Sequence, residues 1–441
     1  MESSRRIRFA AGMTRRCPFL SPLLFAGLFF SLSMNAEEYI AIYDEADVPA
    51  YDLPDPLVFE NGEKVSSAAD WEKRRAEIMA LFEKHVYGKT VLGRPEGMRF
   101  ETTKGPIPFL GGKATLSEIR IHFTSREGPF LDLLLIKPKE IPADGVPTFV
   151  ALNFRGNHTI DPSPEITLNQ NWVTDSSKDR KLGVVENNRA TEKARGFRGT
   201  RWPVEKIIDG GAALATFYYG DADPDFHDEF ENGIHQLTGV PAADEWGSIG
   251  SWAWATSRVR DFLETDENVD QNRVAVFGHS RLGKTALWAG AQDERFALVI
   301  SNNSGCGGAA LSRRRFGERV SRINNSFPHW FCKNFRNYNE KESELPVDQH
   351  MLIALSAPRM VYVASAEGDR WADPKGEFLS VMHASPVFEL LGKTGISSEK
   401  QPANHEPVGG TVRYHVREGA HDVTGYDWEQ YLKAIHDVAG E

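Results

Sequence analysis

Residues 274–284 read VAVFGHSRLGK, and they join an apolar run to a segment of good helix formers, TALWAGAQ. An apolar run that stops at a glycine and a serine is typical of a buried strand that turns directly into a helix. The usual nucleophile elbow at such a corner has the pattern G-x-S-x-G. Here the second glycine comes one residue late, at Gly283. The stretch predicts either an elbow with an unusual right flank or an ordinary turn capped by Ser280.

Strand-like and helix-like segments alternate on both sides of this stretch. Strands are expected within 146–154, 213–225, 274–278, 296–305, 359–369 and 410–422, a hairpin over 114–136, and helices over 70–88, 247–265 and 427–440. This alternation predicts an α/β fold in three layers, with a mostly parallel central sheet between helices. In such sheets chemistry collects at the carboxyl ends of the strands, so the polar loops there are the expected site.

The composition and the N-terminus indicate an exported globular protein. The 441 residues are 41% hydrophobic and 26% charged, which suits a soluble protein with a large core. Residues 1–36 resemble a secretory signal peptide cleaved near Ala36; the alternative is an uncleaved membrane anchor. They hold five arginines and one glutamate, so 46 basic and 61 acidic residues remain, a net charge of −15. We expect one α/β catalytic domain over 37–441, with 37–110 as an N-terminal extension packing on it.

This acidic balance argues against nucleic acid and anionic membranes as partners. Periplasmic and secreted locations both fit the leader. Cys306 and Cys332 can form a disulfide in an exported chain or stay two buried thiols, and the sequence favours neither. No CxxC motif or His-rich ligand spacing indicates a metal, so we expect no cofactor.

Polar residues after three late strands follow the order nucleophile, acid, base of an α/β-hydrolase. Ser280 follows the first strand, and His421 lies in EGAHD near the C-terminus. Between them, the segment SAEGDRWADP supplies the carboxylates Glu367, Asp369 and Asp373. A serine needs a base at neutral pH, and a carboxylate fixes the tautomer of that base. Each residue alone could be a cap, turn or loop residue, but together they predict a serine hydrolase.

The chain resembles the glucuronoyl esterases of carbohydrate esterase family 15, whose elbow reads G-x-S-R-x-G-K and is matched by GHSRLGK. Further similar segments are LNFRGNHT (152–159), WGSIGSWAW (246–254), SGCGGAALSRRRFGE (304–318), FPHWFC (327–332), LPVDQHMLIALSAPR (345–359) and EGDRWADP (367–374). The resemblance is closest to the bacterial branch. It implies an α/β-hydrolase that cleaves esters linking lignin alcohols to (4-O-methyl-)glucuronic acid branches of glucuronoxylan, without a cofactor. We expect a monomer.

By this resemblance Ser280 is the nucleophile and His421 the general base. Arg281 is similar to the family arginine whose side chain and backbone N–H hold the oxyanion, where a fixed cation stabilises the developing charge. Other carboxylesters, including acetyl xylan, remain alternative substrates.

Lys284, Glu318 and Trp371 match positions that contact the sugar in the family. A ring against a sugar face, flanked by charged donors and acceptors, suits a pyranose. Taken by themselves, Lys284 can be a solvated helix lysine and Trp371 a core residue.

One position departs from the family pattern. Many members carry the triad acid on the loop that reads SNNSGCGG here, and the matching residue is Asn303. An amide cannot carry the charge that stabilises an imidazolium. The resemblance to some bacterial members assigns the acid to Asp369, with Glu367 and Asp373 as fallbacks, and Asn303→Ala is expected to do little. Without a working acid, the chain would be a catalytically weak carbohydrate-binding relative.

Overall fold

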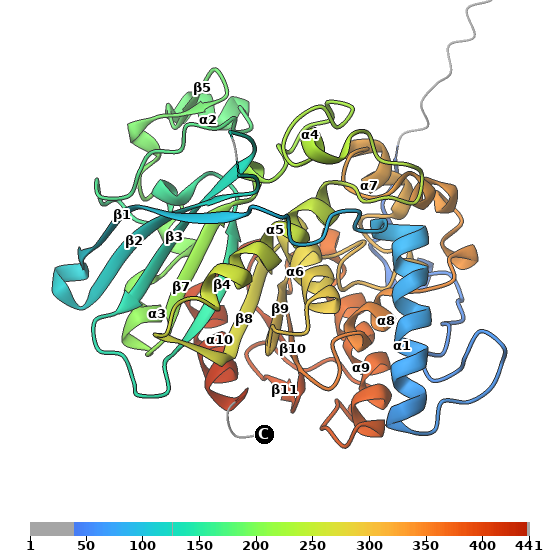
Figure 1. Ribbon diagram of the computed structural model, residues 1–441. Coiled ribbons are helices and arrows are strands. Elements are labelled where there is room, and N and C mark those ends of the chain that lie inside the picture. The colour runs from blue at the N-terminus through green and yellow to red at the C-terminus, as the bar shows by residue number, and fades with distance from the viewer. Residues whose placement is uncertain (1–38, 126, 439–441) are drawn as a thin grey trace, which may run out of the picture. The chain divides into compact units, whose positions relative to one another are not determined.

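A ten-stranded sheet carries the fold, with the strand order β1-β2-β3-β7-β4-β8-β9-β10-β12-β11 (Figure 1). The computed structural model describes residues 39–125 and 127–438. Residues Ala41–Glu441 form one compact unit, to which everything below refers; Met1–Ile40 count as a unit of their own. The leader predicted over 1–36 lies outside the described residues, and the domain boundaries stay a prediction.

The middle of the sheet is parallel and its edges are antiparallel. β7, β4, β8, β9, β10 and β12 pair in parallel. β1, β2 and β3 add an antiparallel edge, and the short β11 closes the other. The strands are β1 (Arg99–Phe109), β2 (Ala114–His122), β3 (Phe130–Pro138), β4 (Val146–Asn153), β7 (Ala213–Tyr218), β8 (Val269–His279), β9 (Leu298–Asn302), β10 (Met360–Ala366), β11 (Val408–Gly409) and β12 (Val412–Arg417); β5 (Val185–Glu186) and β6 (Arg189–Ala190) form a separate pair.

Helices cover both faces of this sheet, as predicted. The helices are α1 (Ala68–Phe82), α2 (Ser177–Leu182), α3 (Val204–Asp209), α4 (His235–Thr238), α5 (Ser248–Leu263), α6 (Arg281–Gln292), α7 (Val320–Ser326), α8 (Gln349–Ala354), α9 (Pro374–Leu390) and α10 (Gly425–Asp437). Because successive strand residues point to opposite faces, Val274 and Val276 pack in one core with α1, α5, α6, α8 and α9. Ala275 and Phe277 pack in the other with α3 and α10. β8 is therefore buried on both sides.

The sequence did not predict β1 or α9. β1 is mostly exposed and lacks the alternation of apolar and polar residues that marks a half-buried strand. α9 contains Pro386 and buries residues around most of its circumference, so it shows no amphipathic stripe. The helix expected over 70–88 is α1 followed by a π-helical turn, Glu83–Tyr87, ending at Gly88.

The structure decides between the two alternatives for the cysteines. Cys306 and Cys332 are separate buried thiols, so the disulfide alternative is wrong. Within 39–125 and 127–438, no helix is both long and apolar enough to cross a bilayer.

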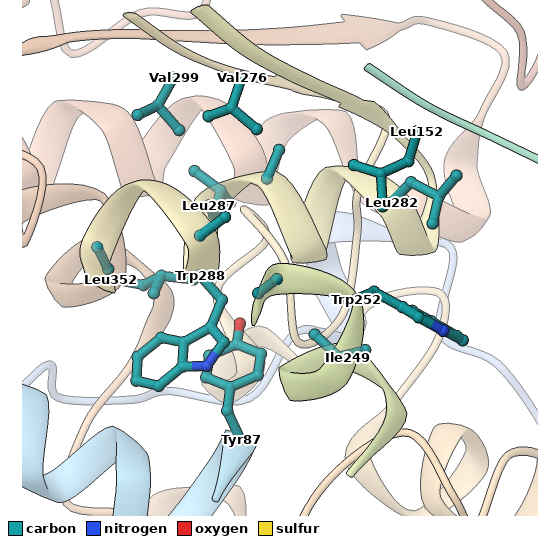
Figure 2. Close-up of a cluster of buried hydrophobic side chains, with 14 of the residues drawn as sticks. Tyr87, Leu152, Ile249, Trp252, Val276, Leu282, Leu287, Trp288, Val299 and Leu352 are labelled. Atoms are coloured by element: carbon teal, nitrogen blue, oxygen red, sulfur yellow. The ribbon is translucent and has the colours of Figure 1, made fainter. Parts of the chain in front are cut away.

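Helix α6, which begins directly after Ser280, is fixed by the larger core (Figure 2). Residues 282–291 are all buried. The Trp288 ring stacks on Tyr87 with centroids 4.6 Å apart and planes at 20°. Fully burying a large apolar side chain contributes about 1.5–3 kcal/mol. Such packing holds the start of α6, and the serine before it, in one position.

Candidate active site

Ser280 lies at the corner between β8 and α6 in a strained backbone conformation. Its φ is 60° and its ψ is −128°, although it is not a glycine. A non-glycine residue in such a conformation costs about 1–3 kcal/mol, and such strain is concentrated at functional sites. Its side chain makes no capping hydrogen bond to α6. The interpretation of Ser280 as a mere helix cap is therefore wrong.

The two glycines of GHSRLGK are required by close approaches of the backbone. A Cβ on Gly278 would lie 1.8 Å from the carbonyl oxygen of Leu282. A Cβ on Gly283 would lie 2.9 Å from the Cβ of Ser304, on the loop after β9. Leu282 instead points into the core. The late glycine thus lies where α6 packs tightly against the loop after β9. The corner is an elbow.

His421 and Asp369 are in direct polar contact. His421 Nδ1 lies 2.5 Å from Asp369 Oδ2. Since a carboxylate only accepts, Nδ1 carries the proton and Nε2 is left as the basic nitrogen. Asn303 Nδ2 donates to the same Asp369 oxygen at 2.8 Å. The asparagine at the family's usual acid position thus supports the displaced carboxylate.

The two fallback acids are engaged elsewhere. Glu367 Oε2 accepts a hydrogen bond from Asn404 at 2.5 Å. Asp373 pairs with Arg314 Nε at 2.8 Å and caps α9 through the N–H of Gly376. Neither carboxylate has a hydrogen bond or ion pair with a histidine in the described part of the chain.

Arg281 is held by a network that the sequence did not reveal. Its guanidinium pairs with Asp225, which is 2% exposed, and lies 4.5 Å above the Trp330 ring. Asp225 also accepts hydrogen bonds from His329 Nε2 at 2.9 Å, Trp330 Nε1 at 2.7 Å and Tyr219 OH at 2.7 Å. Burial alone would raise the pKa of Asp225, but the Arg281 charge and the His329 bond hold it well below its usual range. In the sequence, the Asp-rich loop at the end of 213–225 was the available sign of this network.

Lys284, Glu318 and Trp371 form a second group near Arg281. Lys284 is 3% exposed, donates to the carbonyl oxygen of Ser304, and has a pKa lowered by burial. Burial raises the pKa of Glu318, with the Lys284 and Arg281 charges and a Trp371 hydrogen bond opposing that rise. Trp371 is 37% exposed. The alternatives of a solvated lysine and a core tryptophan are therefore wrong, while the roles in sugar binding stay a proposal.

A cavity of about 240 Å³ opens at Ser280. It is lined by Phe154, Arg155, Thr159, Thr174, Arg198, Arg201, Trp202, Tyr219, His279, Ser280, Arg281 and His421. The elbow serine, the histidine and the arginine thus meet one space that can hold a substrate. Among the residues with a described placement, no group of three or more His, Cys, Asp or Glu side chains could hold a metal ion.

The parallel sheet and the strained serine corner after β8 define an α/β-hydrolase. Residues 202–392 match the family model described as glucuronyl esterase, fungi. Carbohydrate esterase MZ0003, from an unknown prokaryotic organism, is 50% identical over 406 residues, covering 90% of this chain and 92% of that protein. The solved glucuronoyl esterase from Solibacter usitatus is 47% identical with a TM-score of 0.83, covering 89% of this chain and 99% of the other. The chain belongs to carbohydrate esterase family 15, the glucuronoyl esterases, and is a carboxylic ester hydrolase.

Proposed function

We propose that the mature chain is an exported, monomeric serine esterase that hydrolyses (4-O-methyl-)glucuronoyl esters between glucuronoxylan and lignin alcohols. The observation that carries this is the His421–Asp369 contact at 2.5 Å, beside a strained Ser280 that lines the same cavity as His421. Relatives named for glucuronoyl esters support the acyl group; one is the 4-O-methyl-glucuronoyl methylesterase of Cerrena unicolor, 28% identical over 78% of this chain. The N-terminal leader pattern supports export.

In the acylation step, Ser280 Oγ attacks the C6 carbonyl carbon of the uronate while its proton passes to His421 Nε2. The Asp369 carboxylate stabilises the imidazolium that forms. Negative charge develops on the carbonyl oxygen, where the Arg281 guanidinium and the free N–H groups at the start of α6 stabilise it. The C–O bond to the alcohol then breaks, and the alcohol leaves with the proton from His421.

In the second step, a water molecule gives a proton to His421 and attacks the acyl-enzyme. The Ser280 ester bond breaks, the serine recovers its proton, and free uronate leaves. Lys284, Glu318 and Trp371 hold the sugar ring throughout. The exposed Trp371 ring offers an apolar face, and the charges of the buried Lys284 and the half-buried Glu318 are suited to hydroxyl groups.

The test offers benzyl glucuronate, methyl galacturonate and acetylated xylan to the purified protein and to Ser280→Ala. We expect rapid cleavage of benzyl glucuronate and a loss of about 10³-fold or more in kcat for the variant, because the covalent route is removed. Cleavage of acetyl esters alone would show a different carboxylesterase. Binding to glucuronoxylan without turnover would show a carbohydrate-binding relative, for which the Asp369–His421 contact leaves little basis.

A further inference from the structure

Three arginines line the cavity next to Ser280, besides Arg281. Arg155 follows β4, and Arg198 and Arg201 come from the segment before α3. The whole chain carries a net charge of −11. Positive charge is therefore concentrated at the cavity that Ser280 lines, although the chain as a whole is acidic.

These arginines differ in their partners. Arg155 pairs with Asp179 at 2.8 Å, and Arg201 pairs with Asp422. Arg198 has no hydrogen bond or ion pair from its guanidinium to any described residue, and lies 4.8 Å above the Phe197 ring. Burial, and then the charges of Arg201 and Arg155, lower the pKa of Arg198. A partly buried cation facing two others is stabilised by an anion that reaches it.

The placement proposed for the sugar ring leaves this cavity for the alcohol side of the ester. An ester carbonyl has two substituents, here the uronate ring and the alcohol. The residues proposed to hold the ring, Lys284, Glu318 and Trp371, are all absent from the cavity lining. With the ring on their side of Ser280, the alcohol extends into the cavity, where Phe154 and Trp202 supply aromatic surface.

We propose that Arg198 is the anion-binding residue of a subsite for the leaving alcohol, and that this subsite takes an aromatic alcohol bearing a carboxylate. The ring of the alcohol packs against the aromatic wall, and the guanidinium of Arg198 pairs with the carboxylate. Arg155 and Arg201 strengthen the local positive potential while staying engaged with their own carboxylates. This inference rests on the proposed function, because it assumes an ester of glucuronic acid at Ser280.

The experiment compares three esters of glucuronic acid: benzyl, 4-carboxybenzyl and 4-carbamoylbenzyl. The carbamoyl ester matches the carboxyl ester in size without its charge. For the unmodified enzyme we expect kcat/KM for the carboxyl ester to exceed that for the carbamoyl ester by about tenfold, the ratio expected of one charge-assisted hydrogen bond. In Arg198→Gln this ratio falls to about one. In Lys181→Gln, which removes one positive charge from exposed surface in the same region, the ratio is retained.

The salt dependence of this ratio and inhibition by free glucuronate are measured as well. If Arg198→Gln does not fold, the ratio for the unmodified enzyme must still shrink as salt is raised, because a partly exposed ion pair is screened. An equal rate for the carboxyl and carbamoyl esters overturns the inference. So does inhibition by free glucuronate that Arg198→Gln relieves without any preference among the esters, because the cavity would then hold the product acid. Failure to cleave even benzyl glucuronate would instead refute the proposed function.

Discussion

Two buried aspartates, Asp369 and Asp225, each hold one side chain of the proposed catalytic machinery, and they differ in what they hold. Asp369 contacts His421, which is 41% exposed, and takes a second hydrogen bond from Asn303. Asp225 accepts from four donors at once and binds Arg281, a permanent cation. Asp369 thus accepts from two described side chains, and Asp225 accepts from four.

The difference separates a charge needed during the reaction from one needed for geometry. His421 becomes positive only while it carries the proton of Ser280, so the charge of Asp369 acts on the transition state. Arg281 is positive before, during and after the reaction. Asp225 therefore contributes by fixing where that charge lies.

The largest effect is expected for Asp369→Asn. An amide cannot stabilise the imidazolium, and its NH₂ group favours the wrong tautomer of His421, so we expect kcat to fall by about 10³- to 10⁴-fold. Steady-state kinetics on benzyl glucuronate measure this. Glu367→Gln, a change at a carboxylate that accepts a hydrogen bond from Asn404, is the matched control and should lose less than twofold in kcat. A loss below tenfold for Asp369→Asn would show that Asp369 is not the acid.

A smaller effect is expected for Asp225→Asn. The variant loses the charge opposite Arg281, so the guanidinium settles away from the oxyanion, and kcat should fall by about 10²-fold while KM changes little. Asp225→Glu, which keeps the charge, should recover part of the loss. Asp228→Asn is the control, since Asp228 accepts hydrogen bonds from Phe230 and Asn232 of its own loop. A rise in KM at constant kcat would show that Arg281 binds the ground state.

Some of these features could be predicted from the sequence and others could not. Strand–helix alternation predicted the parallel part of the sheet, and chain order predicted that Ser280 and His421 meet, because both follow from local pattern. The triad acid was harder to predict, because Glu367, Asp369 and Asp373 lie close together after one strand. Which of them faces His421 depends on the local backbone conformation. The partners of Asp225 could not be predicted at all.

The reason is the distance in sequence between the donors that converge on this carboxylate. Tyr219, Arg281, His329 and Trp330 come from three separate parts of the chain, after β7, after β8 and after α7. No periodicity or spacing links them. Only the tertiary packing of the folded chain brings these segments to one carboxylate.

The smallest effect is expected for Asn303→Ala, and it tests how loosely Asp369 is held. The sequence indicated little effect, but Asn303 Nδ2 donates to Asp369 at 2.8 Å, so we now expect kcat to fall by about tenfold. Asn303 has a φ of 47°, a conformation that alanine tolerates poorly. Asn303→Gly is therefore the matched variant, because it removes the same amide without the backbone strain. Equal losses in both would assign the effect to the hydrogen bond, whereas normal activity in the glycine variant would show that Asp369 is held by His421 and its own loop alone.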